Sequence, residues 1–190
     1  FMKIALQAEG VPVAPWVTVR RARWDSDPEA VRTDAAALGD VLFVKPARAG
    51  SSVGVSKVHH PGEFDDALAL AFAEDDKVLI ESALVGREIE VAVLEGRRGA
   101  PARSSLPGEV VLTTREFYDF EGKYLGGDGV DVRCPAELEA SEIEVIQALG
   151  ARAFEAVDGR GLARVDFFLT SDGLVVNELN TMPGFTPISM

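Results

Sequence analysis

The sequence predicts a mixed fold of helices and strands in two parts, and three patterns indicate it. Over residues 1–81, short apolar runs alternate with amphipathic stretches, which is typical of strands that alternate with helices. Residues 88–94 alternate polar and apolar side chains strictly, as a half-buried strand does. Near the end of the chain, two strand-like runs flank Ser171-Asp172-Gly173, a turn sequence that favours a β-hairpin.

The composition fits a globular protein with a real core and excludes two classes of partner. Of 190 residues, 47% are hydrophobic and 26% are charged. The formal net charge of −12 disfavours nucleic-acid backbones and anionic membranes, so we expect neither as a partner. No signal-peptide pattern or membrane-length apolar run is present. Cys134 is the single cysteine, which fits the reducing cytoplasm as the location.

In the first part, apolar periodicity and turn residues predict seven elements. They are a short helix at 4–9, strands at 17–20, 41–46, 55–58 and 77–81, and helices at 26–38 and 63–73. Ser26 and Glu29 have the spacing of a capping box for the first of the two longer helices. The strand that carries Lys45 is followed by a loop of small residues at 47–54. Glycines and serines there would let backbone N–H groups approach a phosphate.

The second part begins near Ser82, and its elements are separated by a longer irregular stretch. We expect strands at 88–94, 108–113, 163–170 and 174–180, and a long loop at 117–130. Ser141 and Glu144 form a second capping box, which predicts a helix that runs to about residue 157.

A three-residue turn at 171–173 would fix the pairing of the last two strands. In that register Thr170 faces Leu174, Phe168 faces Val176, Asp166 faces Glu178, and Arg164 faces Asn180. One face would then carry the core residues Ala163, Val165, Phe167, Leu169, Val175 and Leu179. The opposite face has Phe168 and Val176 at one end, and the four polar residues at the other.

An aspartate directly across from a glutamate is repulsive, by about 0.2–1 kcal/mol on an exposed sheet face. Two carboxylates and an amide are oxygen ligands that suit Mg²⁺. We therefore predict a metal site at Asp166, Glu178 and Asn180. The alternative is a solvated face on which Arg164 neutralises Asp166.

Six strings along the chain resemble D-alanine–D-alanine ligases of the ATP-grasp superfamily. They are Phe-Val-Lys-Pro at 43–46, Gly-Ser-Ser-Val-Gly-Val-Ser-Lys-Val at 50–58, Gly-Arg-Glu-Ile-Glu at 86–90, Phe-Tyr-Asp-Phe-Glu-Gly-Lys-Tyr at 117–124, Gly-Leu-Ala-Arg-Val-Asp-Phe-Phe at 161–168, and Asn-Glu-Leu-Asn-Thr-Met-Pro-Gly-Phe at 177–185. The resemblance implies an α+β ATP-grasp fold, in which two subdomains with antiparallel sheets grip ATP. Residues 1–81 would be the small central subdomain and residues 82–190 the C-terminal one.

The resemblance also implies roles for individual residues. At the nucleotide it places Lys45, Ser51 and Ser52 (phosphates), Glu81 (adenine amino group), Ala83 and Leu84 (adenine edge, through the backbone), Glu88 (ribose), Phe117 and Phe168 (adenine faces), and Asn177. It places Asp166, Glu178 and Asn180 on two Mg²⁺ ions, which Mn²⁺ could replace. Catalytic roles fall to Arg164, Lys123 and Tyr118, and to Gly184 and Ser189 where the oxyanion develops. Other interpretations stay open: Phe117 and Phe168 as ordinary core residues, Tyr118 as a loop anchor, and Glu90 as a solvent-facing or supporting side chain.

The implied activity joins two D-alanines into D-alanyl-D-alanine through an acyl phosphate, with ATP, for peptidoglycan precursor synthesis. The resemblance implies a homodimer of the full-length protein. The family's N-terminal domain, which helps bind the first D-alanine, has no match in this sequence, so we expect the chain alone to be inactive. Two alternatives remain: a ligase that makes D-alanyl-D-lactate or D-alanyl-D-serine, and an Mg-ATP-binding module without turnover.

Overall fold

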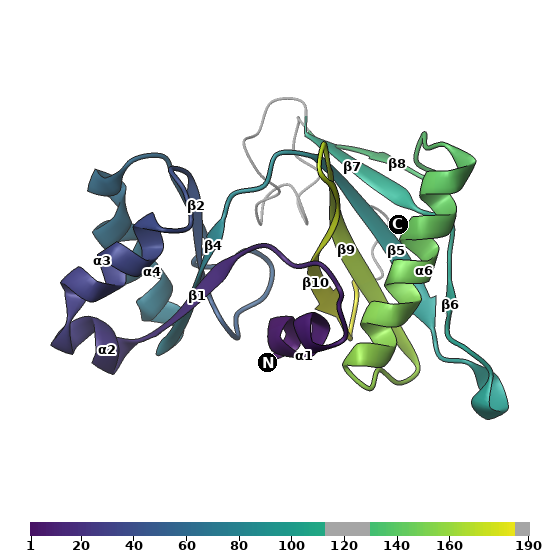
Figure 1. Cartoon of the computed structure of the whole chain (residues 1–190), viewed down its shortest axis with the longest axis horizontal. Helices are drawn as coiled ribbons and strands as arrows, with labels where there is room; N and C mark the ends of the chain where they lie inside the picture. Colours follow the sequence, from purple (N-terminus) through teal and green to yellow (C-terminus); the bar gives the residue numbers. More distant parts are fainter. Residues whose placement is uncertain (113–129, 185–190) are drawn as a thin grey trace. The chain divides into compact units, whose positions relative to one another are not determined.

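The computed structural model describes residues 1–112 and 130–184, and its contacts divide the chain into two units (Figure 1). One unit is Ala14–Leu84. The other combines Phe1–Val13 with the described residues from 85 onward. The first thirteen residues therefore group with the later part of the chain, which differs from the expected division at residue 81. The assignment of the two units to ATP-grasp subdomains stays a prediction.

The unit of residues 14–84 is a four-stranded antiparallel sheet with helices packed on it. Its strands are β1 (Trp16–Arg20), β2 (Leu42–Pro46), β3 (Ser56–Val58) and β4 (Lys77–Ser82), in the order β1-β4-β2-β3. Its helices are α2 (Arg21–Ser26), α3 (Pro28–Ala36), the 3-10 turn η1 (Pro61–Glu63) and α4 (Phe64–Glu74). Leu68 and Phe72 of α4 share one core with Val44 and Ile80 of the sheet, because the apolar stripe of the helix faces the strands.

The start of α3 differs from the expected capping box at Ser26. Asp27 is the N-cap, and its carboxylate accepts a hydrogen bond of 3.1 Å from the backbone N–H of Ala30. Ser26 instead ends α2, a short helix that the sequence did not predict, and its hydroxyl donates to the carbonyl of Arg23. Aspartate caps a helix as well as serine does, so spacing alone could not choose between these neighbours.

The second unit is a six-stranded antiparallel sheet in the order β10-β9-β5-β7-β8, with β6 paired to β5. The strands are β5 (Arg87–Leu94), β6 (Arg103–Ser104), β7 (Gly108–Leu112), β8 (Val130–Arg133), β9 (Leu162–Thr170) and β10 (Gly173–Asn180). The helices are α1 (Met2–Ala8) and α6 (Ala140–Ala156), with a 3-10 turn η2 (Arg97–Gly99). Strands β6 and β8 were not predicted.

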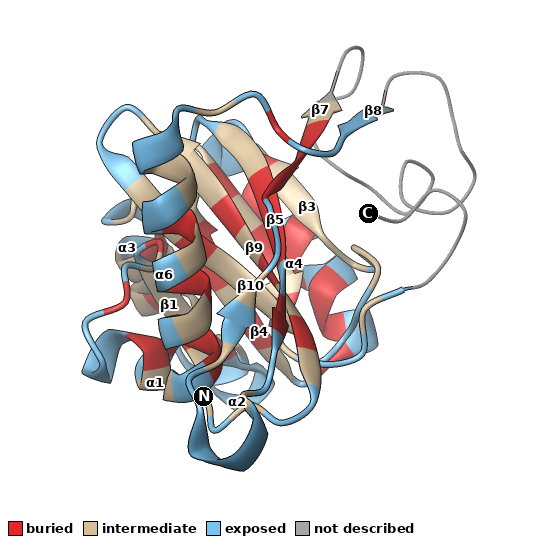
Figure 2. Ribbon diagram, turned by 90° about the vertical axis from the view of Figure 1, so that its right-hand side faces the viewer, coloured by how far each residue is buried: buried red, intermediate tan, exposed pale blue. Residues whose placement is uncertain are grey.

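One face of this sheet is covered by α6, which contacts β5, β9 and β10. Leu6 of α1, Phe154 of α6 and Phe167 of β9 are buried in the shared core, and Figure 2 shows the buried positions along β5 and β9 in red. The helix α6 begins earlier than expected, since its capping box is formed by Glu139 and Glu142 and not by Ser141 and Glu144. None of the helices within residues 1–112 and 130–184 has the length and apolar character needed to cross a bilayer.

The β9–β10 hairpin corrects part of the predicted register. Gly173 pairs with Thr170, so the turn has two residues, and the predicted pairing of Thr170 with Leu174 was wrong. The register then shifts between Val176 and Glu178, where Asn177 is the extra residue of a β-bulge. As a result Val176 is fully buried in the core and Val175 is only half-buried, the reverse of the expected order.

Gly86 comes just before β5 and approaches the backbone of β9 closely. A Cβ atom at this position would lie 2.5 Å from the carbonyl oxygen of Leu169. We expect Gly86→Ala to lower the free energy of unfolding by roughly 1–3 kcal/mol, because the backbone of one strand must shift. Chemical denaturation measures this, with Val85→Ala as the control because the Val85 side chain is exposed. An unchanged denaturation transition in Gly86→Ala would mean that the strand backbone can move to accept the Cβ atom without loss of stability.

Candidate functional site

Three carboxylates form a row across β10, β9 and β5. After the bulge, Asp166 lies opposite Glu178 on one side, as predicted, and opposite Glu90 on the other side. The neighbours of Asp166 on β9, Val165 and Phe167, are buried in the core. Because side chains alternate along a strand, Asp166 lies on the face of the sheet that points away from the core.

Arg164 holds this row together from the same face of β9. Its Nε and Nη2 atoms donate to the two carboxylate oxygens of Asp166 at 2.6 and 2.7 Å. The same Nε lies 3.1 Å from Oε2 of Glu90. On the other side, Asn180 pairs with Arg164 in register, and its Nδ2 donates to Asp166 at 2.9 Å and approaches Glu178 at 3.5 Å.

The electrostatics of this cluster strongly favour a charged Arg164. Burial alone would lower the pKa of the guanidinium. The hydrogen bond to Asp166 and the charges of Asp166, Glu90 and Glu178 outweigh burial, so the pKa of Arg164 is raised above its usual range. The alternative that Arg164 neutralises Asp166 therefore describes a real contact, although Asp166 is mostly buried and not solvated.

The donor chemistry of Asp166, Glu178 and Asn180 fits a hard divalent cation. Two carboxylates and an amide supply oxygen ligands, and Mg²⁺ needs only one or two carboxylates besides phosphate and water oxygens. Asn180 donates its N–H to Asp166, so its amide would have to turn to offer oxygen. Within the two described stretches, no group of three or more His, Cys, Asp or Glu side chains is arranged to hold a metal on its own.

Three further predicted residues lie beside this cluster. Glu88 on β5 pairs with Phe168 on β9, and Glu90 pairs with Asp166 two residues further along the same strands. The two pairs therefore lie on the same face of the sheet. Phe168 is half-buried, while its neighbour Phe167 is the core residue. Phe168 is therefore not an ordinary core side chain. Asn177 is placed by the bulge, immediately before Glu178.

The unit of residues 14–84 carries six of the other predicted residues, and two of them form an ion pair. Lys45 on β2 and Glu81 on β4 are diagonal neighbours, since Phe43 pairs with Glu81 and Lys45 pairs with Leu79. The Nζ of Lys45 lies 2.6 Å from Oε2 of Glu81, which is buried. The structure thus brings together two side chains that the resemblance assigns to the phosphates and to the adenine.

The loop after β2 has an unusual backbone at the two predicted serines. Ser51 and Ser52 both adopt left-handed conformations, with φ angles of 56° and 59°. Each such non-glycine residue costs on the order of 1–3 kcal/mol, so the conformation persists only where the surrounding structure imposes it. Backbone N–H groups of Val53 and Val55 donate to Gly50 and Ser52, so the loop is a folded series of turns.

The remaining predicted residues either were assigned contacts through their backbone or lie outside the described residues. The N–H of Ala83 donates to Val41, so a contact from Ala83 to a ligand would use its carbonyl group. Leu84 is half-buried and Gly184 is exposed. Phe117, Tyr118, Lys123 and Ser189 lie outside the residues that the structure describes, as does most of the predicted loop at 117–130.

Two residues of the site were not in the predicted set. Glu90 joins the carboxylate row only because β5 is the neighbour of β9, and its buried carboxylate contacts Arg164. The signal in the sequence was a glutamate on the same strand face as Glu88, two residues away. Arg48, at the start of the 47–54 loop, forms an ion pair with the buried Asp75.

Comparison with protein families gives a match over nearly the whole chain. The family model described as "D-ala D-ala ligase C-terminus" matches residues 5–190. A D-alanine–D-alanine ligase from Arthrobacter sp. (strain FB24) is 50% identical over 193 residues, which cover 100% of this chain and 50% of that protein. The ligase of the same name from Kocuria rhizophila is 50% identical over 191 residues, with the same coverage of 100% and 50%. The chain therefore spans about half the length of these curated relatives.

Solved structures agree with the sequence relatives. The VanG D-Ala:D-Ser ligase from Enterococcus faecalis has a TM-score of 0.85 at 33% identity, covering 100% of this chain and 53% of that one. The D-alanine-D-alanine ligase from Coxiella burnetii has a TM-score of 0.79 at 34% identity, covering 98% of this chain and 47% of that one. Together with the two antiparallel sheets, these matches confirm the predicted α+β fold of the ATP-grasp type.

Proposed function

The chain belongs to the D-Ala-D-Ala ligase C-terminus family, and from this premise we propose that it is the ATP- and magnesium-binding half of a D-alanine–D-alanine ligase. The proposed reaction uses ATP to activate one D-alanine as an acyl phosphate, which a second D-alanine attacks to give D-alanyl-D-alanine for peptidoglycan precursors. The observation that carries the proposal is the cluster of Arg164, Asp166, Glu178 and Asn180 on one face of the sheet.

In this proposal the chain's own residues supply charge and orientation for phosphoryl transfer. Asp166, Glu178 and Asn180 would hold two Mg²⁺ ions, which Mn²⁺ could replace. These ions would neutralise the phosphates and orient the nucleotide. Arg164 is held by Asp166 and Glu90, so its cationic group is fixed in place before the substrate arrives. A fixed cation stabilises charge that develops in a transition state without reorganisation during the reaction.

For the nucleotide itself we propose the contacts that the resemblance implies. Lys45 and the serines of the 47–54 loop would bind phosphate oxygens, and Glu88 would accept from the ribose hydroxyls. The half-buried ring of Phe168, which lies on the same face as Asp166 and Glu88, is suited to pack against a base. The resemblance to the ligases further supports a cytoplasmic, homodimeric full-length enzyme.

A second candidate function is the synthesis of D-alanyl-D-serine. The likeness to the VanG D-Ala:D-Ser ligase, at a TM-score of 0.85, supports it. The two candidates differ in the amine acceptor and share the ATP half of the reaction. A full-length enzyme offered D-alanine, D-serine and D-lactate in competition separates them by product analysis. We expect D-alanyl-D-alanine to dominate, and a preference for D-serine would favour the second candidate.

Glu178→Gln tests the metal part of the proposal. We expect Mg²⁺-dependent binding of a non-hydrolysable ATP analogue to weaken by about 10–100-fold, the scale seen when a metal site loses one supporting group. Calorimetric titration of the 190-residue chain, with and without EDTA, measures the effect. Glu144→Gln is the matched control, because Glu144 is an exposed glutamate on α6. Nucleotide affinity that is unchanged by EDTA and by Glu178→Gln would refute the metal assignment.

A further inference from the structure

The loop at 47–54 begins and ends against the same short connection between α4 and β4. At its start, the N–H of Ala47 donates to the carbonyl of Lys77 at 2.9 Å. At its end, Gly54 has a φ of +70°, and a Cβ atom there would lie 2.9 Å from Cγ of Glu74 and 2.9 Å from Cγ of Pro46. The loop is therefore closed on residues 74–77, and a side chain at position 54 would force these neighbours to shift.

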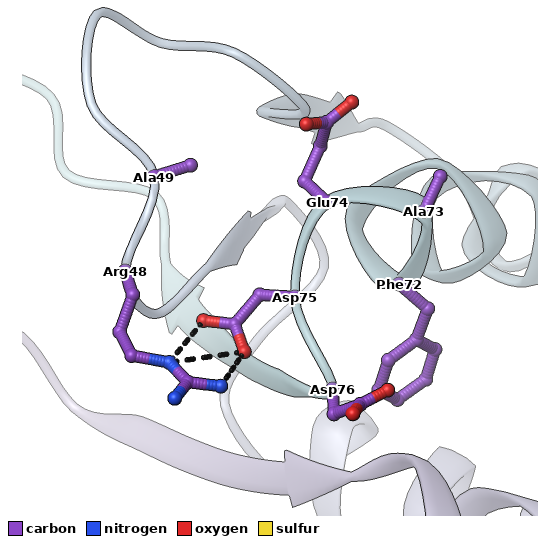
Figure 3. A pocket seen from close by; sticks show the side chains of 7 residues that line it. All are labelled: Arg48, Ala49, Phe72, Ala73, Glu74, Asp75 and Asp76. Carbon is purple, nitrogen blue, oxygen red and sulfur yellow. Dashed lines mark hydrogen bonds and ion pairs between the residues drawn. The ribbon is translucent and has the colours of Figure 1, made fainter.

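An ion pair fastens the loop to this connection. The Nε of Arg48 lies 3.2 and 3.0 Å from the two carboxylate oxygens of Asp75, and Nη2 also contacts the carboxylate (Figure 3). The backbone N–H of Lys77 donates to the same carboxylate at 3.0 Å. Asp75 thus joins the first residues of the loop to the first residue of β4.

The burial of the two partners is strongly unequal. The Asp75 side chain is 3% exposed, whereas the Arg48 side chain is 73% exposed. The hydrogen bonds from Arg48 and Lys77 lower the pKa of Asp75 to about 2, against the desolvation that raises it. Asp75 is therefore charged at neutral pH, and the carboxylate is the fixed member of the pair.

We infer that Asp75 is a positioning residue, which holds the 47–54 loop through Arg48 in the conformation that binds the phosphates of ATP. That the loop binds phosphates rests on the proposed function. That Asp75 anchors the loop rests on the structure alone. The two successive left-handed serines need such an anchor, because surrounding structure must impose a strained backbone. A loop that is ordered before binding loses less conformational entropy when the nucleotide arrives.

Two variants break the pair from opposite sides. Asp75→Asn removes the buried charge and nearly keeps the size of the side chain, whereas Arg48→Gln removes the exposed partner and leaves the buried carboxylate to the N–H of Lys77. Asp76→Asn is the matched control, because this adjacent aspartate is 81% exposed and pairs with Arg21 instead. In the absence of nucleotide, we expect hydrogen exchange of the amides of residues 47–54 to become roughly 10-fold faster in both variants and to stay unchanged in the control.

Calorimetry then separates positioning from a loss of structure. For the magnesium complex of a non-hydrolysable ATP analogue, we expect the dissociation constant to rise roughly 10-fold in Asp75→Asn and Arg48→Gln, with an unchanged number of sites per chain. A partly unfolded protein would instead keep its dissociation constant and lose sites. Unchanged exchange in both variants would overturn the inference, and so would faster exchange with unchanged affinity. If the unmodified chain binds no nucleotide, the proposed function fails, while the exchange result still decides whether Asp75 anchors the loop.

Discussion

Arg164→Ala is expected to destabilise the unit that contains β5, β9 and β10 by about 3–5 kcal/mol, the cost of leaving buried charges without their partner. Arg164 contacts both Asp166 and Glu90, and both carboxylates are largely buried. Without it, three carboxylates face one another across neighbouring strands. Both tryptophans of the chain lie in residues 14–84, so their fluorescence follows the other unit. Unfolding of the unit that contains β9 is instead measured by hydrogen exchange of residues 162–170 during denaturation.

The matched control for this variant is Arg160→Ala. Arg160 lies four residues earlier and makes surface ion pairs with Glu95 and Asp158, with 70% of its side chain exposed. Exposed pairs of this kind contribute about 0–1 kcal/mol. Arg164→Lys keeps the charge but loses the bidentate hydrogen bonds. Its loss of stability should therefore fall between the losses of the two alanine variants. Equal losses for Arg164→Ala and Arg160→Ala would show that the carboxylate row does not depend on Arg164.

The second large effect concerns turnover. We expect a polypeptide of residues 1–190 to bind Mg-ATP and to form no measurable D-alanyl-D-alanine. The chain matches about half of its relatives' length, and the resemblance places the residues that hold the first D-alanine in the other half. Correct positioning of two reactants is worth roughly 7–11 kcal/mol, so its loss removes nearly all activity.

Fusion to the missing half of a relative checks the reason for that result. The N-terminal half of the Arthrobacter ligase, joined in one polypeptide to residues 1–190, should restore dipeptide synthesis, measured by product formation and ADP release. Arg164→Ala in the same fusion serves as the inactive comparison. Steady dipeptide synthesis by residues 1–190 alone would contradict the division of labour, because the acceptor site would then lie within this chain.

The opposition of Asp166 and Glu178 was predictable from the sequence, although the turn beside it was not. We predicted a three-residue turn, and the structure has a two-residue turn followed by one bulged residue. Both arrangements place Asp166 opposite Glu178. The two descriptions differ only between the turn and the bulge, which is why Val175 and Val176 were assigned to the wrong faces. The number of residues between two positions does not show where a β-bulge interrupts the pairing of the strands.

The neighbour on the other side of β9 was not predictable in the same way. Glu90 and Asp166 are 76 positions apart in the sequence, and no turn or local pattern specifies that β5 lies beside β9. The pair of Arg48 and Asp75 has the same character, since it joins a loop to a distant connection. Local patterns therefore predicted most of the elements and the strand face that carries the proposed metal ligands, while contacts between distant segments required the structure.

We propose that one face of the β9–β10 hairpin binds the metal of a metal–nucleotide complex, and paramagnetic NMR can locate that metal. Mn²⁺ with a non-hydrolysable ATP analogue is titrated into the ¹⁵N-labelled chain, whose mass of 20.3 kDa suits such spectra. We predict that the amide signals of residues 164–168 and 178–180 broaden first, and that Asp166→Asn combined with Glu178→Gln abolishes this. Broadening that is confined to the acidic residues 74–76, or that the double substitution leaves unchanged, would rule out a metal site on this face of the hairpin.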